Sequence, residues 1–151
     1  KVESVTQAFL TSEPYFMELE NVPVESKLIS DAGYDPYNVV LYVTKDYLAE
    51  NEATVKAFTT AFIEGWNLYK DSYEEINKLV QKDNPDIELA SLKFEAEAQE
   101  QFVYGMDAAE NGVGFMTEQR WATLIEQLHD LELLDEVFDA KDIFTTDYLV
   151  Q

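Results

Sequence analysis

Cysteine is absent from the sequence of 151 residues, and its absence excludes disulfides, thiolate zinc sites and cysteine nucleophiles. It is compatible with an extracytoplasmic location but does not establish one. Basic residues are also few, because ten lysines and arginines stand against 31 aspartates and glutamates. The resulting formal charge of -21 argues against nucleic acids and anionic membrane surfaces as partners.

Long apolar runs and phosphate-binding glycine loops are missing as well. No apolar run approaches the ~18 residues that span a bilayer. The stretch "ENGVGF" has two glycines but lacks the lysine and the strand–helix context of a phosphate loop. What is present is a large apolar fraction of 46%, with 13% aromatics. A disordered chain would be poorer in both, so we expect one folded domain with a core.

Catalytic and metal-binding sets are not found in the sequence. His129 is the single histidine and lies on an amphipathic segment, where a surface or packing role is expected. No Ser–His–Asp set or nucleophile motif can be assembled around it. The acidic stretch "DNPDIE" lacks the spacing and the glycine of a calcium loop. No metal site and no cofactor is therefore predicted.

The hydrophobic pattern changes from period two to period 3.6 after Thr44. Strands are predicted at 4–10, 25–30 and 38–44, and Pro14 begins a short helix over 14–20. Four further helices and one loop are predicted, namely helices 51–71, 72–82 with Ser72 as N-cap, 87–105 and 118–133 with Thr117 as N-cap, and a loop at 108–115. Gly65, inside the helix at 51–71, is expected to allow close packing against another element.

The expected fold class is therefore α/β, with three or so strands followed by four or more helices. Three strands form a small sheet for so many helices, which suggests that N-terminal strands are missing. The opening "KVESVTQAFL" also lacks an initiator methionine. We expect a fragment of a longer protein, and a complete domain freed from a tag is the alternative.

Aromatic residues give the strongest indication of a ligand. Tyr34 and Tyr37 lie in a turn-rich connection between two predicted strands. Aromatic rings with a few fixed polar groups suit a small planar ligand, whereas the alternative is that these rings fill core space. Phe9 and Phe16 flank the stretch "TSEP" at 11–14, and for them the core role is favoured.

The order of several segments resembles one protein family. "VTQAFLTSEPYFMEL", "ISDAGYDPYNVVLYVTKDYL" and "VKAFTTAFIEGWNLYKD" follow one another as in the substrate-binding proteins of ABC importers. The branch in question takes thiamine pyrimidine precursors, riboflavin, taurine, alkanesulfonates and nitrate. The later "GVGFMTEQRWATLIEQLHDLELL" and "FTTDYL" match its C-terminal pattern, so the resemblance covers nearly the whole chain.

The resemblance implies a fold of two α/β lobes with the ligand in the cleft between them. The chain looks like the C-terminal half of such a periplasmic-binding-protein-like fold. Residues 1–34 would then belong to the second lobe, and 35–44 would be a crossover strand. Residues 45–151 would form the helical C-terminal part of the first lobe.

The resemblance also implies a ligand-binding role for the "TSEP" stretch. In the thiamine-precursor binders, a Glu directly before Pro faces the cleft and accepts hydrogen bonds from an aminopyrimidine, and Glu13 matches it. Thr11 stands where those binders can carry a tyrosine, which leaves the ligand open. A helix-capping role for Glu13 is the alternative. The predicted ligand-binding residues are Glu13, Thr11, Ser12, Tyr34 and Tyr37.

The function expected from the resemblance is that of an extracytoplasmic solute-binding protein, in the periplasm or lipid-anchored at the outer face of the membrane. It would capture a small heteroaromatic solute, such as a thiamine pyrimidine precursor, by lobe closure and deliver it to a membrane permease without catalysis. A sulfonate, nitrate or riboflavin is the alternative ligand. Glu13 favours a neutral or cationic solute, and Arg120, the sole arginine, is not assigned to an anion.

Two other classes of function are considered. Relatives that make the thiamine pyrimidine are enzymes with a cysteine-rich motif and histidine, which argues against an enzyme here because this chain has no cysteine and one histidine. A helical interaction domain would explain the helices but not the predicted strand–"TSEP"–helix opening. If the chain is a fragment, exposed hydrophobic surface and self-association are expected.

Overall fold

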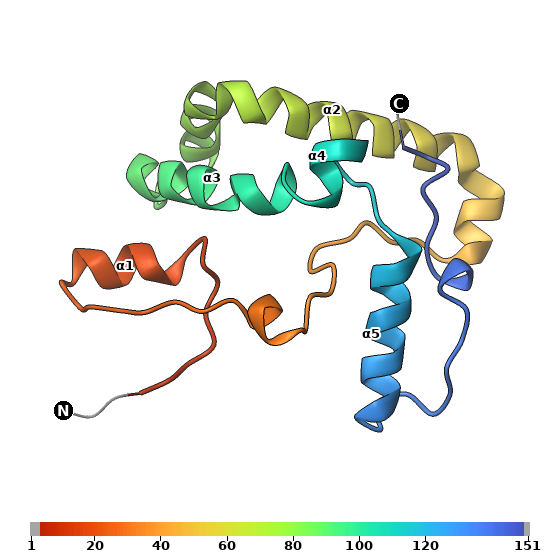
Figure 1. Ribbon diagram of the computed structural model, residues 1–151. Coiled ribbons are helices and arrows are strands. Elements are labelled where there is room, and N and C mark those ends of the chain that lie inside the picture. The colour runs from red at the N-terminus through yellow and green to blue at the C-terminus, as the bar shows by residue number, and fades with distance from the viewer. Residues whose placement is uncertain (1–3, 150–151) are drawn as a thin grey trace. The chain divides into compact units, whose positions relative to one another are not determined.

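The computed structural model describes residues 4–149, and the regular structure in this range is helical (Figure 1). The helices are α1 (Glu13–Leu19), α2 (Lys45–Asp83), α3 (Leu89–Val103), α4 (Asp107–Asn111) and α5 (Glu118–Asp130). Two short 3-10 helices, η1 (Ile29–Ala32) and η2 (Ala140–Asp142), complete the set. Within residues 4–149 there is no strand, so the predicted α/β fold class is wrong.

The predicted strands fail because a strand needs a neighbour. Residues 4–9 and 38–44 are irregular, and the stretch 25–30 runs into η1 at Ile29. Leu28 does have extended dihedral angles, with φ -76° and ψ 137°. Extended backbone becomes a strand only when another strand supplies hydrogen bonds, and none does so in the described part of the chain.

Three predicted helices are confirmed by the structure. Pro14 lies in the first turn of α1, where its missing N–H leaves no helical hydrogen bond unmade. The segments α3 and α5 lie inside the ranges predicted for them. Thr117 is the N-cap of α5, and its Oγ1 accepts a hydrogen bond from the backbone N–H of Arg120 at 3.3 Å. Local signals at helix ends were sufficient for these elements.

The predicted break at Ser72 is wrong, since α2 is continuous through this residue. The helix begins at Lys45, where Thr44 Oγ1 accepts a hydrogen bond from the Tyr47 N–H at 3.1 Å. It ends at Asp83, two residues before Pro85, which cannot donate a helical hydrogen bond. A serine inside a helix carries the same side chain as one at a cap, so its position must be judged from the backbone around it.

Two predictions that involve glycines differ from the structure. Part of the predicted loop at 108–115 is α4, which is followed by its C-cap residue Gly112 with φ 92°. Gly65 lies in α2, and a Cβ placed there would meet no atom within 4 Å in the described structure. Close packing at Gly65, which the sequence suggested, is therefore not found.

The chain divides into two compact units. Of the described residues, unit 1 comprises 4–27 and 68–103, with α1, the C-terminal part of α2, and α3. Unit 2 comprises 28–67 and 104–149, with the N-terminal part of α2, α4, α5 and both 3-10 helices. The lobe boundaries expected at 34 and 44 concern a larger architecture and stay a prediction.

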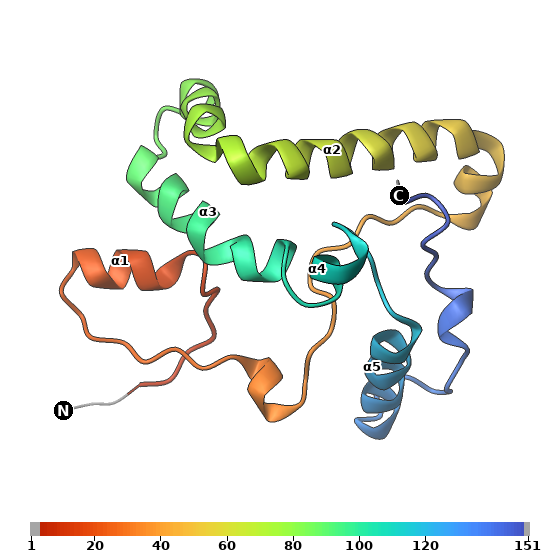
Figure 2. The ribbon, with the colours of Figure 1, turned by 45° about the horizontal axis from the view of Figure 1, so that its top comes forward.

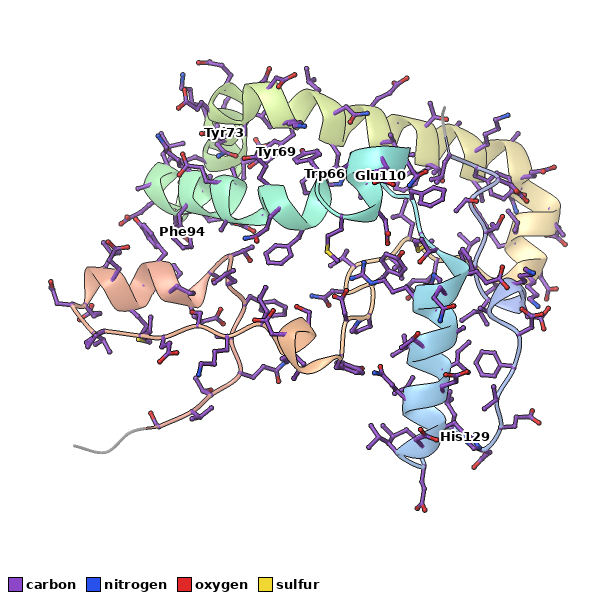
Figure 3. All side chains as sticks on the ribbon, viewed as in Figure 1. Trp66, Tyr69, Tyr73, Phe94, Glu110 and His129 are labelled. Carbon is purple, nitrogen blue, oxygen red and sulfur yellow. The ribbon has the colours of Figure 1, made fainter. Side chains whose placement is uncertain are left out.

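Unit 1 has a small core that includes a polar residue. Leu92 and Ala96 of α3 are buried, as is Asn77 of α2. The Tyr69 hydroxyl donates to Asn77 Oδ1 at 2.8 Å. The ring of Tyr15 on α1 lies 5.4 Å from that of Phe94 on α3, centroid to centroid. Figure 3 shows where Tyr69 and Phe94 lie on their helices.

Unit 2 buries Ile63, Ile125 and Ala140. Helix α5 packs against η2, and both views show these two elements side by side (Figures 1 and 2). Gly114 has φ 85°, and a Cβ there would lie 3.5 Å from Leu149 Cδ2, so glycine suits both the backbone and the space.

Large apolar side chains remain exposed on the N-terminal part of α2. Phe58 and Phe62 are 60% and 38% exposed, and their rings stack at 6.2 Å. This agrees with the exposed hydrophobic surface expected from the sequence, whereas self-association stays a prediction. No helix in the described residues is both long and apolar enough to cross a membrane.

Candidate functional site

The "TSEP" stretch forms a tight turn that leads into α1. The backbone N–H of Ser12 donates to the Phe9 carbonyl at 3.0 Å, and the N–H of Tyr15 donates to the Ser12 carbonyl at 3.1 Å. Ser12 is the N-cap residue, but its side chain makes no capping hydrogen bond to the described residues. Thr11 and Ser12 are half-buried.

Glu13 is the first residue of α1 and its side chain is exposed. Its Oε2 accepts a hydrogen bond from the backbone N–H of Phe9 at 2.8 Å, which closes the turn from the side-chain end. The other oxygen, Oε1, has no hydrogen-bond partner among residues 4–149. One oxygen of the carboxylate is thus fixed by the backbone, and the other is available to accept a hydrogen bond.

Tyr34 and Tyr37, predicted together, have different surroundings in unit 2. Tyr34 is 37% exposed, and its hydroxyl has no hydrogen-bond partner in the described part of the chain. The Tyr37 hydroxyl donates to Asp107 Oδ2 at 2.5 Å and accepts from the Thr117 N–H at 2.8 Å. Tyr34 is therefore free to meet a ligand, whereas Tyr37 is engaged in holding unit 2 together.

Arg120 joins the segment around Tyr37 to α5. Its Nε donates to the Asp35 carbonyl at 2.6 Å, and its Nη2 donates to Asp35 Oδ1 at 2.8 Å. Its Nη1 lies 3.5 Å from Asp107 Oδ2, and its guanidinium carbon lies 4.2 Å from the centroid of the Tyr37 ring. The arginine side chain is only 20% exposed. We call Arg120, Asp35, Tyr37 and Asp107 the Arg120 clasp.

The sequence indicated Arg120 only as the sole arginine of an acidic chain. Its partner Asp35 lies 85 residues away, and the partner of Tyr37, Asp107, lies 70 residues away. No local pattern connects such residues. A shallow hollow of about 90 Å³ lies beside the clasp, and Gly33, Asp35, Pro36, Arg120, Thr123, Leu124 and Gln127 line it.

The predicted ligand-binding residues fall in both units. Thr11, Ser12 and Glu13 belong to unit 1, and Tyr34 and Tyr37 belong to unit 2. Their joint role in one cleft stays a prediction.

Metal-binding and catalytic chemistry gain no support from the described residues. Between residues 4 and 149 no group of three or more His, Asp or Glu side chains could hold a metal ion. His129 lies at the C-terminal end of α5 and is exposed, with Nδ1 at 4.0 Å from Asp130 Oδ1 (Figure 3).

Unit 1 carries two tyrosines with a shifted pKa. Burial raises the pKa of Tyr69, and the hydrogen bond to Asn77 lowers it by a smaller amount. Loss of solvation also raises the pKa of Tyr73, whose hydroxyl donates to Glu97 Oε1 at 3.2 Å. Both shifts favour the neutral phenol, so these tyrosines are donors to their partners and not acids at neutral pH.

The comparison with known proteins now defines the class. The model of a family described as "NMT1/THI5 like" matches residues 1–76, a range that includes the "TSEP" turn, Tyr34 and Tyr37. The chain belongs to the NMT1/THI5-like family. This confirms, at the level of the family, the resemblance to binders of thiamine precursors, nitrate and taurine. The family consists mainly of solute-binding proteins. No curated protein matches the chain.

Proposed function

We propose that this protein is the solute-binding component of an ABC importer, and that it captures a small heteroaromatic solute such as a thiamine pyrimidine precursor. The family match over residues 1–76 carries the proposal, because this range contains every predicted ligand-binding residue. Under the proposal the protein acts outside the cytoplasm, in the periplasm or lipid-anchored at the outer face of the membrane. It delivers its solute to a membrane permease.

Solute capture would proceed by lobe closure. We propose that the chain is the C-terminal half of a binder whose full-length form has two lobes. A ligand that contacts both lobes stabilises the closed state by the difference between its affinities for the two states.

Glu13 supplies the polar contact that fits an aminopyrimidine. Its Oε2 is held by the Phe9 N–H at 2.8 Å, so the chain orients the carboxylate before any solute arrives. Its Oε1 is left to accept a hydrogen bond from a solute amine. A charge-assisted hydrogen bond of this kind is about twice as strong as one between neutral groups.

The engagement of Arg120 favours a heteroaromatic solute over an anion. Arg120 is the sole arginine, and its guanidinium already faces the carboxylates of Asp35 and Asp107. A sulfonate or nitrate needs donors or cations that are not so occupied. Tyr34, with its exposed ring and unpaired hydroxyl among the described residues, offers the stacking surface that a planar solute needs.

A binding role without catalysis fits the residue inventory better than an enzyme does. Family relatives that make the thiamine pyrimidine depend on a cysteine-rich motif and histidine. This sequence has no cysteine, and His129 is exposed at the end of α5.

Titration calorimetry of the full-length protein with an aminopyrimidine, riboflavin, taurine and nitrate tests the proposal. We expect the aminopyrimidine to bind best, and Glu13→Gln to weaken it by about 1–3 kcal/mol, or about 5- to 150-fold. The glutamine carbonyl can still accept from Phe9, while its amide presents a donor in place of Oε1. The hydrogen bond that closes the turn is thereby kept, while the acceptor that would face the solute amine is replaced by a donor.

Glu18→Gln is the matched control, because Glu18 is an exposed carboxylate on the same helix. It should leave the affinity unchanged. Tight binding of taurine or nitrate together with a silent Glu13→Gln would refute the proposal. The local role of Glu13 in closing the turn would then be its whole role.

A further inference from the structure

The turn at 33–37 is fastened to α5 at several points. Gln127 Nε2 donates to the Gly33 carbonyl at 2.8 Å. Arg120 donates to the Asp35 carbonyl at 2.6 Å and, with Nη2, to the Pro36 carbonyl at 3.4 Å. Three backbone carbonyls on both sides of Tyr34 are thus held by one helix.

The turn needs such fastening because it contains a glycine in the left-handed region. Gly33 has φ 90° and no atom within 4 Å of the position that a Cβ would take. Glycine loses more conformational entropy than other residues when its backbone is fixed. Without the bonds to α5, the backbone next to Tyr34 would have several directions available.

The planar guanidinium of Arg120 can contact Asp35, Asp107 and the Tyr37 ring at the same time. One edge meets the carbonyl and the carboxylate of Asp35, and the opposite nitrogen Nη1 meets Asp107. The flat face lies over the Tyr37 ring at 4.2 Å. A lysine carries the same charge but lacks the planar fork, so it cannot make these contacts together.

Tyr34 is the residue of the turn that these bonds leave free. Its neighbours Gly33 and Asp35 are both held, whereas Tyr34 itself is 37% exposed and its hydroxyl is unpaired within residues 4–149. Fixing the backbone on both sides fixes the direction of the Tyr34 Cα–Cβ bond, and this limits the ring to a few rotamers. We propose that Arg120 is a positioning residue for solute binding, which sets Tyr34 in its binding orientation without touching the solute.

The inference rests on the proposed function, and it reaches beyond the residues that the family model matches. Asp107, Thr117 and Arg120 lie after residue 76, whereas Asp35, Tyr37 and the turn lie before it. Residues outside the matched range therefore control a predicted contact inside it.

A double-mutant cycle tests the role of Arg120. We expect Arg120→Gln to weaken binding of the aminopyrimidine by about fivefold or more when Tyr34 is present, and by less than about twofold when Tyr34 is alanine. Arg120→Lys should lie between the wild type and Arg120→Gln. Lys141→Gln removes an exposed cation beside α5, paired with Glu118 at 3.1 Å, and should change nothing. Equal losses in both backgrounds would overturn the positioning role.

Hydrogen exchange without any solute separates this inference from the proposed function. Arg120→Gln should speed exchange of the backbone N–H groups at 33–35 and 37, and leave the "TSEP" turn of unit 1 unchanged. Unchanged exchange at 33–35 and 37 would refute the proposal that Arg120 fixes the turn at 33–37. If the wild type binds none of the solutes, the proposed function fails together with the solute role of Tyr34. The exchange result then still decides whether Arg120 fixes the turn.

Discussion

The hydroxyl of Tyr37 is the point at which the Arg120 clasp can be weakened most cleanly. Tyr37→Phe removes the donor to Asp107 Oδ2 at 2.5 Å and the acceptor for the Thr117 N–H at 2.8 Å. The ring itself stays, so its contact with the Arg120 guanidinium and its packing on Trp121 at 5.9 Å are retained. The hydroxyl also has a longer hydrogen bond with Thr117 Oγ1 at 3.4 Å, so the change removes these three hydrogen bonds and leaves the surrounding packing in place.

The magnitude follows from the type and exposure of these bonds. A hydrogen bond to a charged group contributes about 1.5–3 kcal/mol and a neutral one about 0.5–1.5 kcal/mol. The Asp107 side chain is 30% exposed and retains its contact with Arg120, so water and arginine offset part of the loss. We expect Tyr37→Phe to lower the free energy of unfolding of unit 2 by about 2 kcal/mol.

Tryptophan fluorescence during urea unfolding is the suitable assay. Both tryptophans, Trp66 and Trp121, belong to unit 2, so their emission reports this unit. With a denaturant slope of about 1–3 kcal/mol per molar urea, the midpoint should fall by about 1 M. Tyr42→Phe is the control, because Tyr42 is 90% exposed. A midpoint for Tyr37→Phe within error of the Tyr42→Phe value would show that the clasp does not stabilise unit 2.

Three further predictions concern the helices. Gly65→Ala should raise stability by about 0.5–1 kcal/mol in urea unfolding, because Gly65 is in the interior of α2 with free space at its Cβ position; a loss would show that something packs there. Burial raises the pKa of Tyr69, so its stabilising effect is complete below about pH 10 and is lost as pH rises from there through the raised value. Difference absorbance against Tyr69→Phe measures this tyrosinate, and ionisation at or below the ordinary pKa would contradict the burial. The exposed rings of Phe58 and Phe62 predict concentration-dependent association in sedimentation, which replacement of both by serine should abolish; a monomeric wild type at all concentrations would refute it.

Local structure was predictable wherever the deciding interaction is local. The Thr117 cap reaches the Arg120 N–H three residues on, and Pro14 acts within the first turn of α1. The strand predictions failed because an alternating pattern at 25–30 and a run rich in β-branched residues at 38–44 specify only an extended tendency. The ladder that would make it a strand depends on a second segment, which the pattern does not describe.

The same distinction separates the two segments of the predicted ligand site. Glu13 is oriented by Phe9, four residues earlier, so the "TSEP" stretch contains both the carboxylate and the group that holds it. Tyr34 is held through carbonyls that bond to Gln127 and Arg120, more than 80 residues later. A sequence motif can therefore identify Glu13 together with the residue that orients it. Tyr34 and Tyr37 look equivalent in the sequence, and only the fold shows that the Tyr37 hydroxyl is hydrogen-bonded to Asp107 and Thr117. Substitutions of Gln127 or Arg120 are accordingly expected to alter solute binding through Tyr34 while leaving the Glu13 contact intact.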